Sequence, residues 1–98
     1  MTRIDLMQGT LDLLILRTLT GGARHGYQIA SSIKAASNEV LQVEEGALYP
    51  ALHRLEGRGW VLSNWGLSEK KRRAKFYELT NAGREALEDQ SRAWDEYV

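Results

Sequence analysis

The stretch Gly46-Ala-Leu-Tyr-Pro-Ala-Leu-His-Arg-Leu-Glu56 is the part of this 98-residue sequence that decides the fold. Leucines recur in it at helical spacing and predict one buried face: Leu48, Leu52 and Leu55. Other side chains lie off that face and are available for contacts outside the core: Tyr49, His53 and Arg54. We therefore predict a helix from Glu44 to Glu56 with one buried side and one functional side.

Pro50 limits where this helix begins. A proline inside a helix lacks the N–H for a backbone hydrogen bond, and its ring clashes with the preceding turn. It fits best if the helix begins near Gly46, which places Pro50 in or just after the first turn. Gly57 and Gly59 then mark the end of the helix.

Two further helices are expected before this stretch. His25 to Ala36 has isoleucines at helical spacing, and residues 37–43 connect it to the central helix. A shorter helix, with Thr10 as its N-cap, is expected to end at Gly21. Leucine and isoleucine surround most of its axis, so a second subunit is expected to cover part of it. Residues 1–8 predict no clear element.

A β-hairpin and a last helix are expected after the central helix. Residues 60–65 and 75–80 are rich in strand-forming side chains, and the polar residues 66–74 join them. Thr80 or Asn81 is then expected to cap a helix that runs to the end of the sequence.

The predicted order of elements is α-α-α-β-β-α, which is the layout of a winged helix-turn-helix. This is a mainly α fold with a small β-hairpin (α+β), and 98 residues allow one domain. We expect residues 1–80 to form the winged-helix domain and residues 81–98 a C-terminal dimerisation helix of the same compact unit. In such a fold the central helix can enter the major groove of DNA.

Charge is distributed unevenly along the chain, although the formal net charge is zero. Residues 51–75 carry seven basic and two acidic side chains, whereas residues 76–98 carry two basic and six acidic ones. A neutral total does not cancel a local basic patch, because salt screens charges beyond about 10 Å. The hairpin is therefore expected to attract phosphates.

Several functional classes find no support in the residues present. The sequence has no cysteine, no nucleophile elbow and no phosphate-binding glycine loop, so we predict no enzymatic activity. His25 and His53 lie on different predicted helices without a third ligand, so neither a metal nor another cofactor is expected. No apolar run approaches the ~20 residues of a membrane span, and no export signal precedes the first helix. We expect a cytoplasmic protein with no membrane partner.

Together these motifs resemble the PadR family of bacterial transcriptional regulators. The resemblance is carried by Leu48 to Glu56, by Gly9 to Leu19, by His25-Gly-Tyr27, and by Lys75 to Thr80 followed by Gly83. It implies a winged-helix fold, a homodimer formed through the last helix, and repression of nearby genes from a roughly palindromic operator. It also implies that a small ligand or a stress signal releases the DNA in many relatives.

The resemblance assigns the central helix as the recognition helix and the hairpin as the wing. Contacts with double-stranded DNA are then expected from the following residues: Tyr27, Glu45, Gly46, Ala47, Tyr49, Pro50, His53, Arg54, Lys70, Lys71, Arg72, Arg73 and Lys75. The two tyrosines would place their hydroxyls on phosphates or near base edges. Ala47 stands where the family often has serine or threonine, so one hydroxyl contact is lost there. Phe76 replaces a tyrosine that is common in the wing strand.

Structural roles compete with these functional ones. Tyr49 can cap the edge of the core, Tyr27 can be a packing residue, and the basic turn can be merely solvated. Arg54 can contact DNA or pair in the neighbourhood of Glu56, and His25 is expected to begin a helix. For the whole chain, the alternative is a winged helix that binds protein instead of DNA. The basic hairpin beside the recognition-helix motif favours DNA.

The dimer interface is expected on the first and last helices, from Leu11, Leu14, Leu87, Trp94 and Tyr97. Leu87 and Trp94 are seven residues apart and form a thin heptad-like seam. Trp94 is expected in the dimer core, and alternatively it stacks on a flat aromatic effector held between the subunits. Such pairing would set two recognition helices about one turn of DNA apart, on the order of 34 Å.

Overall fold

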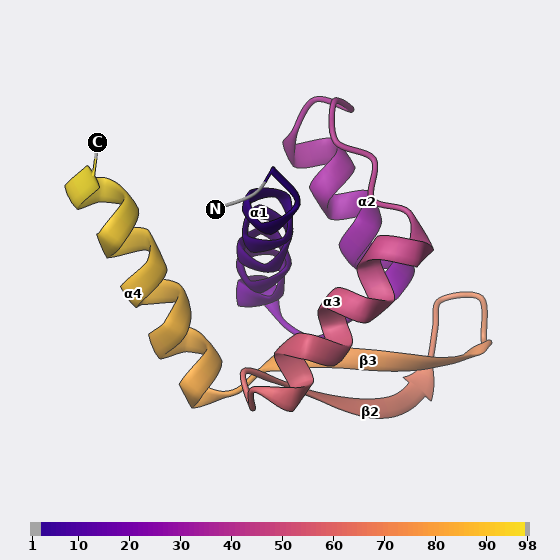
Figure 1. Cartoon of the computed structure of the whole chain (residues 1–98). Coiled ribbons are helices and arrows are strands. Elements are labelled where there is room, and N and C mark those ends of the chain that lie inside the picture. The colour runs from indigo at the N-terminus through magenta and orange to yellow at the C-terminus, as the bar shows by residue number, and fades with distance from the viewer. Residues whose placement is uncertain (1–2, 98) are drawn as a thin grey trace.

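A computed structural model describes the backbone of residues 3–97 and the side chains of residues 9–90. Its elements, in chain order, are α1 (Arg3–Thr18), the 3-10 helix η1 (Leu19–Gly21), β1 (Arg24–His25), α2 (Gly26–Ala36), α3 (Glu45–Gly57), β2 (Val61–Leu67), β3 (Arg73–Leu79) and α4 (Asn81–Tyr97). The mainly helical α+β fold with a hairpin is as predicted. Figure 1 shows α1 between α4 on one side and α2 with α3 on the other, above the sheet.

The predicted start of the first helix is wrong. α1 begins at Arg3, so Thr10 lies inside the helix and is not its N-cap. The residues before Gly9 include no proline, and a glycine inside a helix costs only about 1 kcal/mol relative to alanine. Gly9 is therefore tolerated within α1 and does not mark a boundary.

The sheet has one strand more than the sequence predicts. β1 pairs antiparallel with β3, with Arg24 opposite Tyr77 and His25 opposite Phe76, which gives the strand order β1-β3-β2. A strand of two residues shows no alternation of apolar and polar residues, so only its partner reveals it. The short strand fixes the start of α2 against the hairpin.

The hairpin, which we call the wing (residues 61–79), extends further toward its tip than predicted. The tip, residues 68–72, is closed by hydrogen bonds from the Lys71 N–H to the Ser68 carbonyl and from the Ser68 N–H to the Arg72 carbonyl, both 2.8 Å. Lys71 has a φ of 59°, the left-handed conformation that ends this kind of three-residue hairpin loop. The predicted loop residues 66, 67, 73 and 74 therefore belong to the strands.

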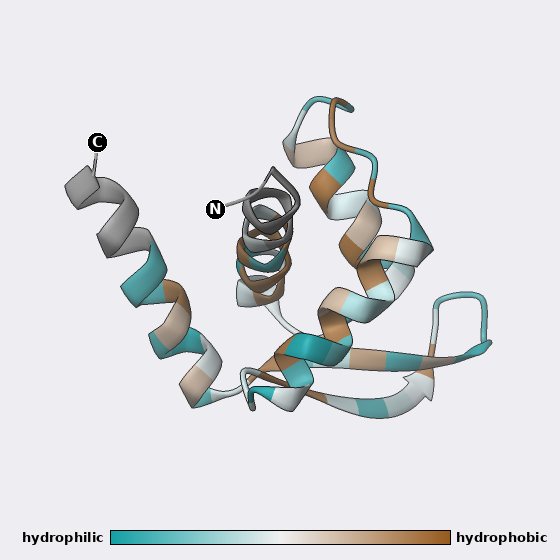
Figure 2. Ribbon diagram, in the orientation of Figure 1, coloured by the Kyte–Doolittle hydropathy of each residue, from teal (hydrophilic) through white to brown (hydrophobic). Residues whose placement is uncertain are grey.

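The core lies where α1, α2 and α3 meet the sheet. The largest fully buried side chains are Ile15, Leu16, Leu19, Ile29, Ile33, Leu52, Leu55 and Val61. α3 begins one residue before Gly46, and Pro50 lies in its second turn. Along these helices hydrophobic residues alternate with hydrophilic ones, whereas the wing tip is hydrophilic (Figure 2).

The first turn of α4 packs closely against Trp60, the residue that precedes β2. The Thr80 hydroxyl accepts a hydrogen bond from the Gly83 N–H at 3.0 Å, which confirms Thr80 as the capping residue. A Cβ atom on Gly83 would lie 2.0 Å from the Trp60 carbonyl oxygen, so only glycine permits this approach.

Of the predicted interface residues, Leu11, Leu14 and Leu87 are partly buried against the core. The side chains of Trp94 and Tyr97 lie outside the described residues. None of the described helices is long and apolar enough to cross a membrane.

Candidate nucleic-acid interface

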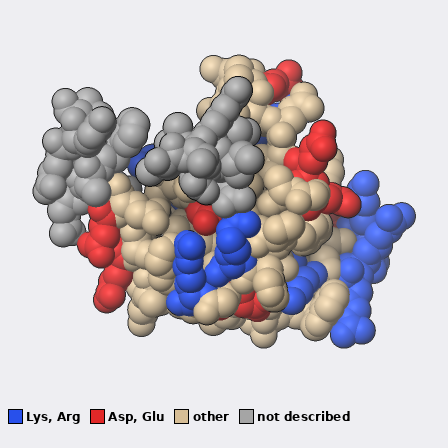
Figure 3. Space-filling model, viewed as in Figure 1, with Lys and Arg blue, Asp and Glu red and all other residues tan. Residues whose placement is uncertain are grey.

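A hollow of about 780 Å³, here called the wing hollow, lies between the start of α2, α3 and the wing. Aromatic and basic side chains line it, among them Tyr27, Tyr49, Trp65, Arg72, Arg73 and Lys75. The space-filling view shows a group of basic residues at the wing, on the right and near acidic residues, and separate basic residues in the middle of the face (Figure 3). The structure thus brings together both predicted tyrosines and most of the predicted wing cations on one concave face.

Tyr49 connects α3 to the first turn of α2. Its side chain is 46% exposed, and a Cβ atom on Gly26 would lie 2.7 Å from its hydroxyl oxygen. Gly26 is therefore the residue that lets the tyrosine approach α2. Tyr27, the next residue, is 78% exposed at the rim of the hollow. Both tyrosines line the hollow and are exposed.

His25 is the N-cap of α2. Its Nδ1 accepts a hydrogen bond from the Gln28 N–H at 3.3 Å, and its own N–H donates to Gln28 Oε1 at 3.1 Å. The imidazole also meets the Phe76 ring edge-on, with 5.3 Å between centroids. Among the described residues, no group of three potential ligands could hold a metal ion. The histidine therefore has the helix-start role that the sequence predicts.

The exposed side of α3 carries no lysine or arginine, because the one arginine of this helix, Arg54, is half-buried. Leu48, Ala51, Leu52 and Leu55 are buried, while the predicted contact residues Glu45, Gly46, Ala47, Pro50 and His53 are exposed. Glu44 and Glu45 stand at the helix N-terminus, where negative charge is favourable to the helix dipole. His53 is exposed on α3 but lies outside the residues that line the hollow.

Arg54 is directed toward α1 and not toward the hollow. Its Nη2 donates to Asp12 Oδ1 at 2.9 Å, and Arg58 Nη1 lies 3.6 Å from the other carboxylate oxygen. Asp12 is only 6% exposed, so this pair joins α1 to α3 inside the protein. The alternative prediction, pairing near Glu56, is wrong, because Glu56 accepts from the Ser63 hydroxyl at 2.5 Å and lies 4.0 Å from Lys75 Nζ.

Sequence reasoning missed Asp12. The signal was present, because Asp12 is an acidic residue within the leucine-rich run of α1, where nearly every neighbour is apolar. A charge in such a place is stable only with a partner of opposite sign. The partner follows only from the packing of α1 against α3.

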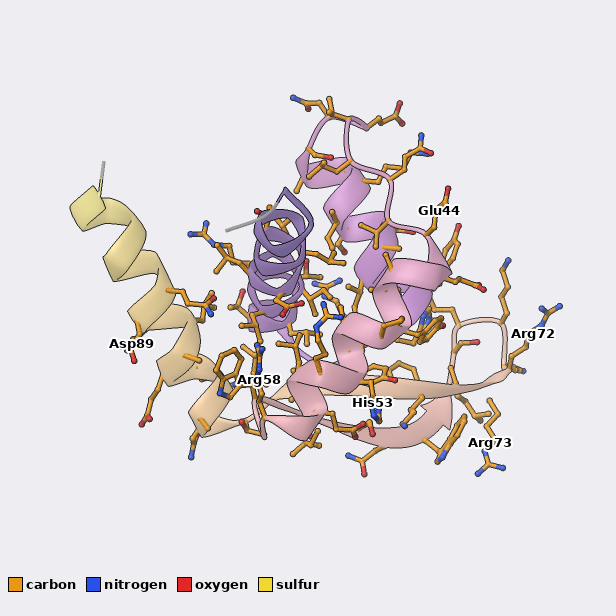
Figure 4. All side chains as sticks on the ribbon, in the orientation of Figure 1. Glu44, His53, Arg58, Arg72, Arg73 and Asp89 are labelled. Carbon is orange, nitrogen blue, oxygen red and sulfur yellow. The ribbon has the colours of Figure 1, made fainter. Side chains whose placement is uncertain are left out.

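The wing carries exposed basic side chains that have no acidic partner among the described residues. Lys70, Lys71, Arg72 and Arg73 are exposed, whereas Lys75 is 4.0 Å from a Glu56 carboxylate oxygen. Figure 4 shows Arg72 and Arg73 extending from the wing away from the rest of the domain. The acidic residue of the tip, Glu69, accepts a hydrogen bond from Gln28 Nε2 at 3.3 Å, which ties the tip to α2.

Tyr77 lies on the floor of the hollow. Burial raises the pKa of its hydroxyl above the ordinary value of 10.0, and the negative charge of Glu56 and the proximity of Tyr49 raise it further. Tyr77 is therefore uncharged at neutral pH. Its ring also lies below Lys75, whose Nζ is 5.9 Å from the centroid.

The chain matches known proteins over most of its length. Residues 15–89 match the transcriptional regulator PadR-like family. The chain is 32% identical over 92 residues to the transcriptional regulator Rv3488 of Mycobacterium tuberculosis, covering 94% of this chain and 82% of that protein. A transcriptional regulator structure from Clostridium thermocellum superposes with a TM-score of 0.84 at 31% identity, over 95% of this chain and 90% of the other.

A further solved structure is that of Bacillus subtilis PadR in complex with operator DNA. It matches with a TM-score of 0.72 and 28% identity, over 83% of this chain and 46% of that longer chain. These proteins are regulators and not enzymes, in agreement with the prediction from the sequence. The chain belongs to the PadR-like family of transcriptional regulators.

Proposed function

We propose that this regulator is a repressor that binds a pseudo-palindromic operator as a homodimer. The observation that carries the proposal is the wing hollow, which is lined by three exposed wing cations, Lys70, Arg72 and Arg73, together with Tyr49 of α3. Phosphate contacts from lysine and arginine supply much of the affinity of a protein for DNA. The similar fold of Bacillus subtilis PadR, solved in complex with operator DNA, supports operator binding by this chain.

In this proposal α3 enters the major groove and the wing follows the phosphate backbone. The exposed residues of α3 between Glu45 and His53 read base edges, with Tyr49 at the centre of that face. Tyr27, in the first turn of α2, contacts a phosphate together with the nearby wing. Arg54 acts on DNA only indirectly, by holding α3 against α1.

The dimer is formed through α1 and α4. Leu11, Leu14 and Leu87 are only partly covered within one subunit, and a second copy would complete their burial. This pairing sets the two copies of α3 about 34 Å apart, the repeat of one DNA turn. A flat aromatic ligand stacked near Trp94, between the subunits, would change that spacing and release the DNA.

A binding titration tests the proposal. The DNA immediately upstream of the protein's own gene is compared with random DNA at several salt concentrations. We expect saturable binding that tightens as salt falls and that exceeds binding to random DNA by ~10³ or more. Absence of binding to any DNA at low salt would contradict the proposal and favour a winged helix that binds protein. Sedimentation at micromolar concentration tests the dimer, which a stable monomer would contradict.

A further inference from the structure

One face of the wing packs against the core at one end and is exposed to solvent toward the tip. At the core end, Ser63 and Tyr77 are opposite each other, and Ser63 binds Glu56 of α3. Two residues further along the same face, Trp65 is opposite Lys75 and is 62% exposed. A tryptophan this exposed on a short strand has little packing role within the subunit.

Arg73 covers part of that tryptophan. It stands two residues before Lys75 on β3, on the same face as Trp65. Its guanidinium carbon lies 4.7 Å from the centroid of the Trp65 ring, within the range of a cation–π contact. Stacking restricts the rotamers of the arginine, and the N–H groups at the edge of the planar guanidinium stay available for a phosphate.

The other exposed cations of the wing differ from Arg73. In the described part of the chain, no ion pair or aromatic stack holds Lys70, Lys71 or Arg72. Binding a phosphate with such a side chain requires it to be ordered at that moment, which weakens the net interaction. Arg73, in contrast, is stacked on Trp65 in the protein without DNA, so part of this ordering precedes binding.

We propose that Trp65 is a positioning residue for DNA binding: it holds the Arg73 guanidinium in the conformation in which it meets a phosphate at the edge of the wing hollow. The inference rests on the proposed function and adds a role for a residue that has no charge and no hydrogen-bonding task. Because phosphate contacts do not depend on sequence, random DNA is sufficient to test it.

The test is a double-mutant cycle, with fluorescence anisotropy of a labelled random-sequence duplex at low salt. Arg73→Ala is expected to weaken binding about tenfold and to lower the salt slope by about one. Trp65→Ala is expected to weaken binding about threefold to fivefold, the cost of ordering a free arginine, with the slope unchanged. The double variant should bind no worse than Arg73→Ala alone, and Trp65→Phe should restore binding to within about twofold of wild type.

Leu62→Ala is the matched control, because Leu62 is exposed on the other face of β2. It should bind as wild type does, and all variants should keep the wild-type unfolding midpoint. Additive effects of the two substitutions would overturn the inference, since Trp65 would then contact DNA or support the wing by itself. Wild-type affinity of Trp65→Ala would overturn it as well. Failure of the wild-type protein to bind any duplex would overturn the proposed function itself, and the inference with it.

Discussion

α3 and the wing border the same hollow but present opposite chemistry. The exposed side of α3 begins with Glu44 and Glu45, and its arginine is held by the buried Asp12. The wing, in contrast, projects four exposed cations into solvent (Figures 3 and 4). In the proposed complex, non-specific attraction to phosphate comes from the wing, whereas α3 has hydroxyl and carboxylate groups with which to discriminate bases. The proposal therefore assigns affinity for DNA to the wing and sequence specificity to α3.

The largest effect is expected from removing the wing charge. Replacing Lys70, Lys71, Arg72 and Arg73 together with alanine should weaken binding to every DNA sequence by on the order of 10²–10³-fold and flatten the salt slope by about four. Titration against operator and random DNA at several salt concentrations measures both. The exposed Lys34 and Arg84, substituted together, are the control for net charge. An unchanged salt slope would show that the wing does not contact phosphates.

The next effect concerns stability and not recognition. Arg54→Ala removes the 2.9 Å partner of a buried carboxylate, so the free energy of unfolding should fall by about 1–3 kcal/mol. Denaturant unfolding measures this loss, and binding of the folded fraction should change little. The double variant Asp12→Leu with Arg54→Met, which leaves only the half-exposed Arg58 without its acidic partner, should recover part of the stability. A large loss of affinity with normal stability would instead return Arg54 to the DNA contacts.

On α3 itself, the hydroxyl of Tyr49 is expected to contribute about one hydrogen bond to DNA. Tyr49→Phe should lower operator affinity about fivefold to tenfold without unfolding the protein. Gly26→Ala should have a similar effect, because its Cβ would lie 2.7 Å from the Tyr49 hydroxyl oxygen and would displace that hydroxyl. Normal affinity of Tyr49→Phe would leave this tyrosine with a packing role only.

The smallest effect is expected at Lys71 in the wing tip, where two substitutions distinguish the contribution of its charge to DNA affinity from the contribution of its backbone conformation to stability. Lys71 has a φ of 59°, which favours glycine, so Lys71→Gly should raise the free energy of unfolding by about 0.5 kcal/mol while it lowers DNA affinity a few-fold. Lys71→Ala should lower affinity equally but should not add stability. A stability gain with unchanged affinity would mean that this lysine does not meet DNA.

The order of the helices and the hairpin follows from the sequence, because apolar periodicity and glycine positions report local structure. The wrong predictions concern the end of a helix and the shortest strand. Gly9 and Thr10 suggested a boundary, whereas α1 continues through them, since a glycine inside a helix costs only about 1 kcal/mol relative to alanine. β1 was missed because its two residues form a strand only through their pairing with β3.

The candidate site shows the same division. The basic tip, the apolar face of α3 and the resemblance to a family can be predicted from the sequence, since they depend on residue type and spacing. Three contacts follow only from the packing of the elements: Arg54 with Asp12, Glu56 with Ser63 and Lys75, and Tyr49 with Gly26. These contacts join residues distant in the chain. Their geometry depends on how the helices pack and how strands register, and no local pattern specifies either.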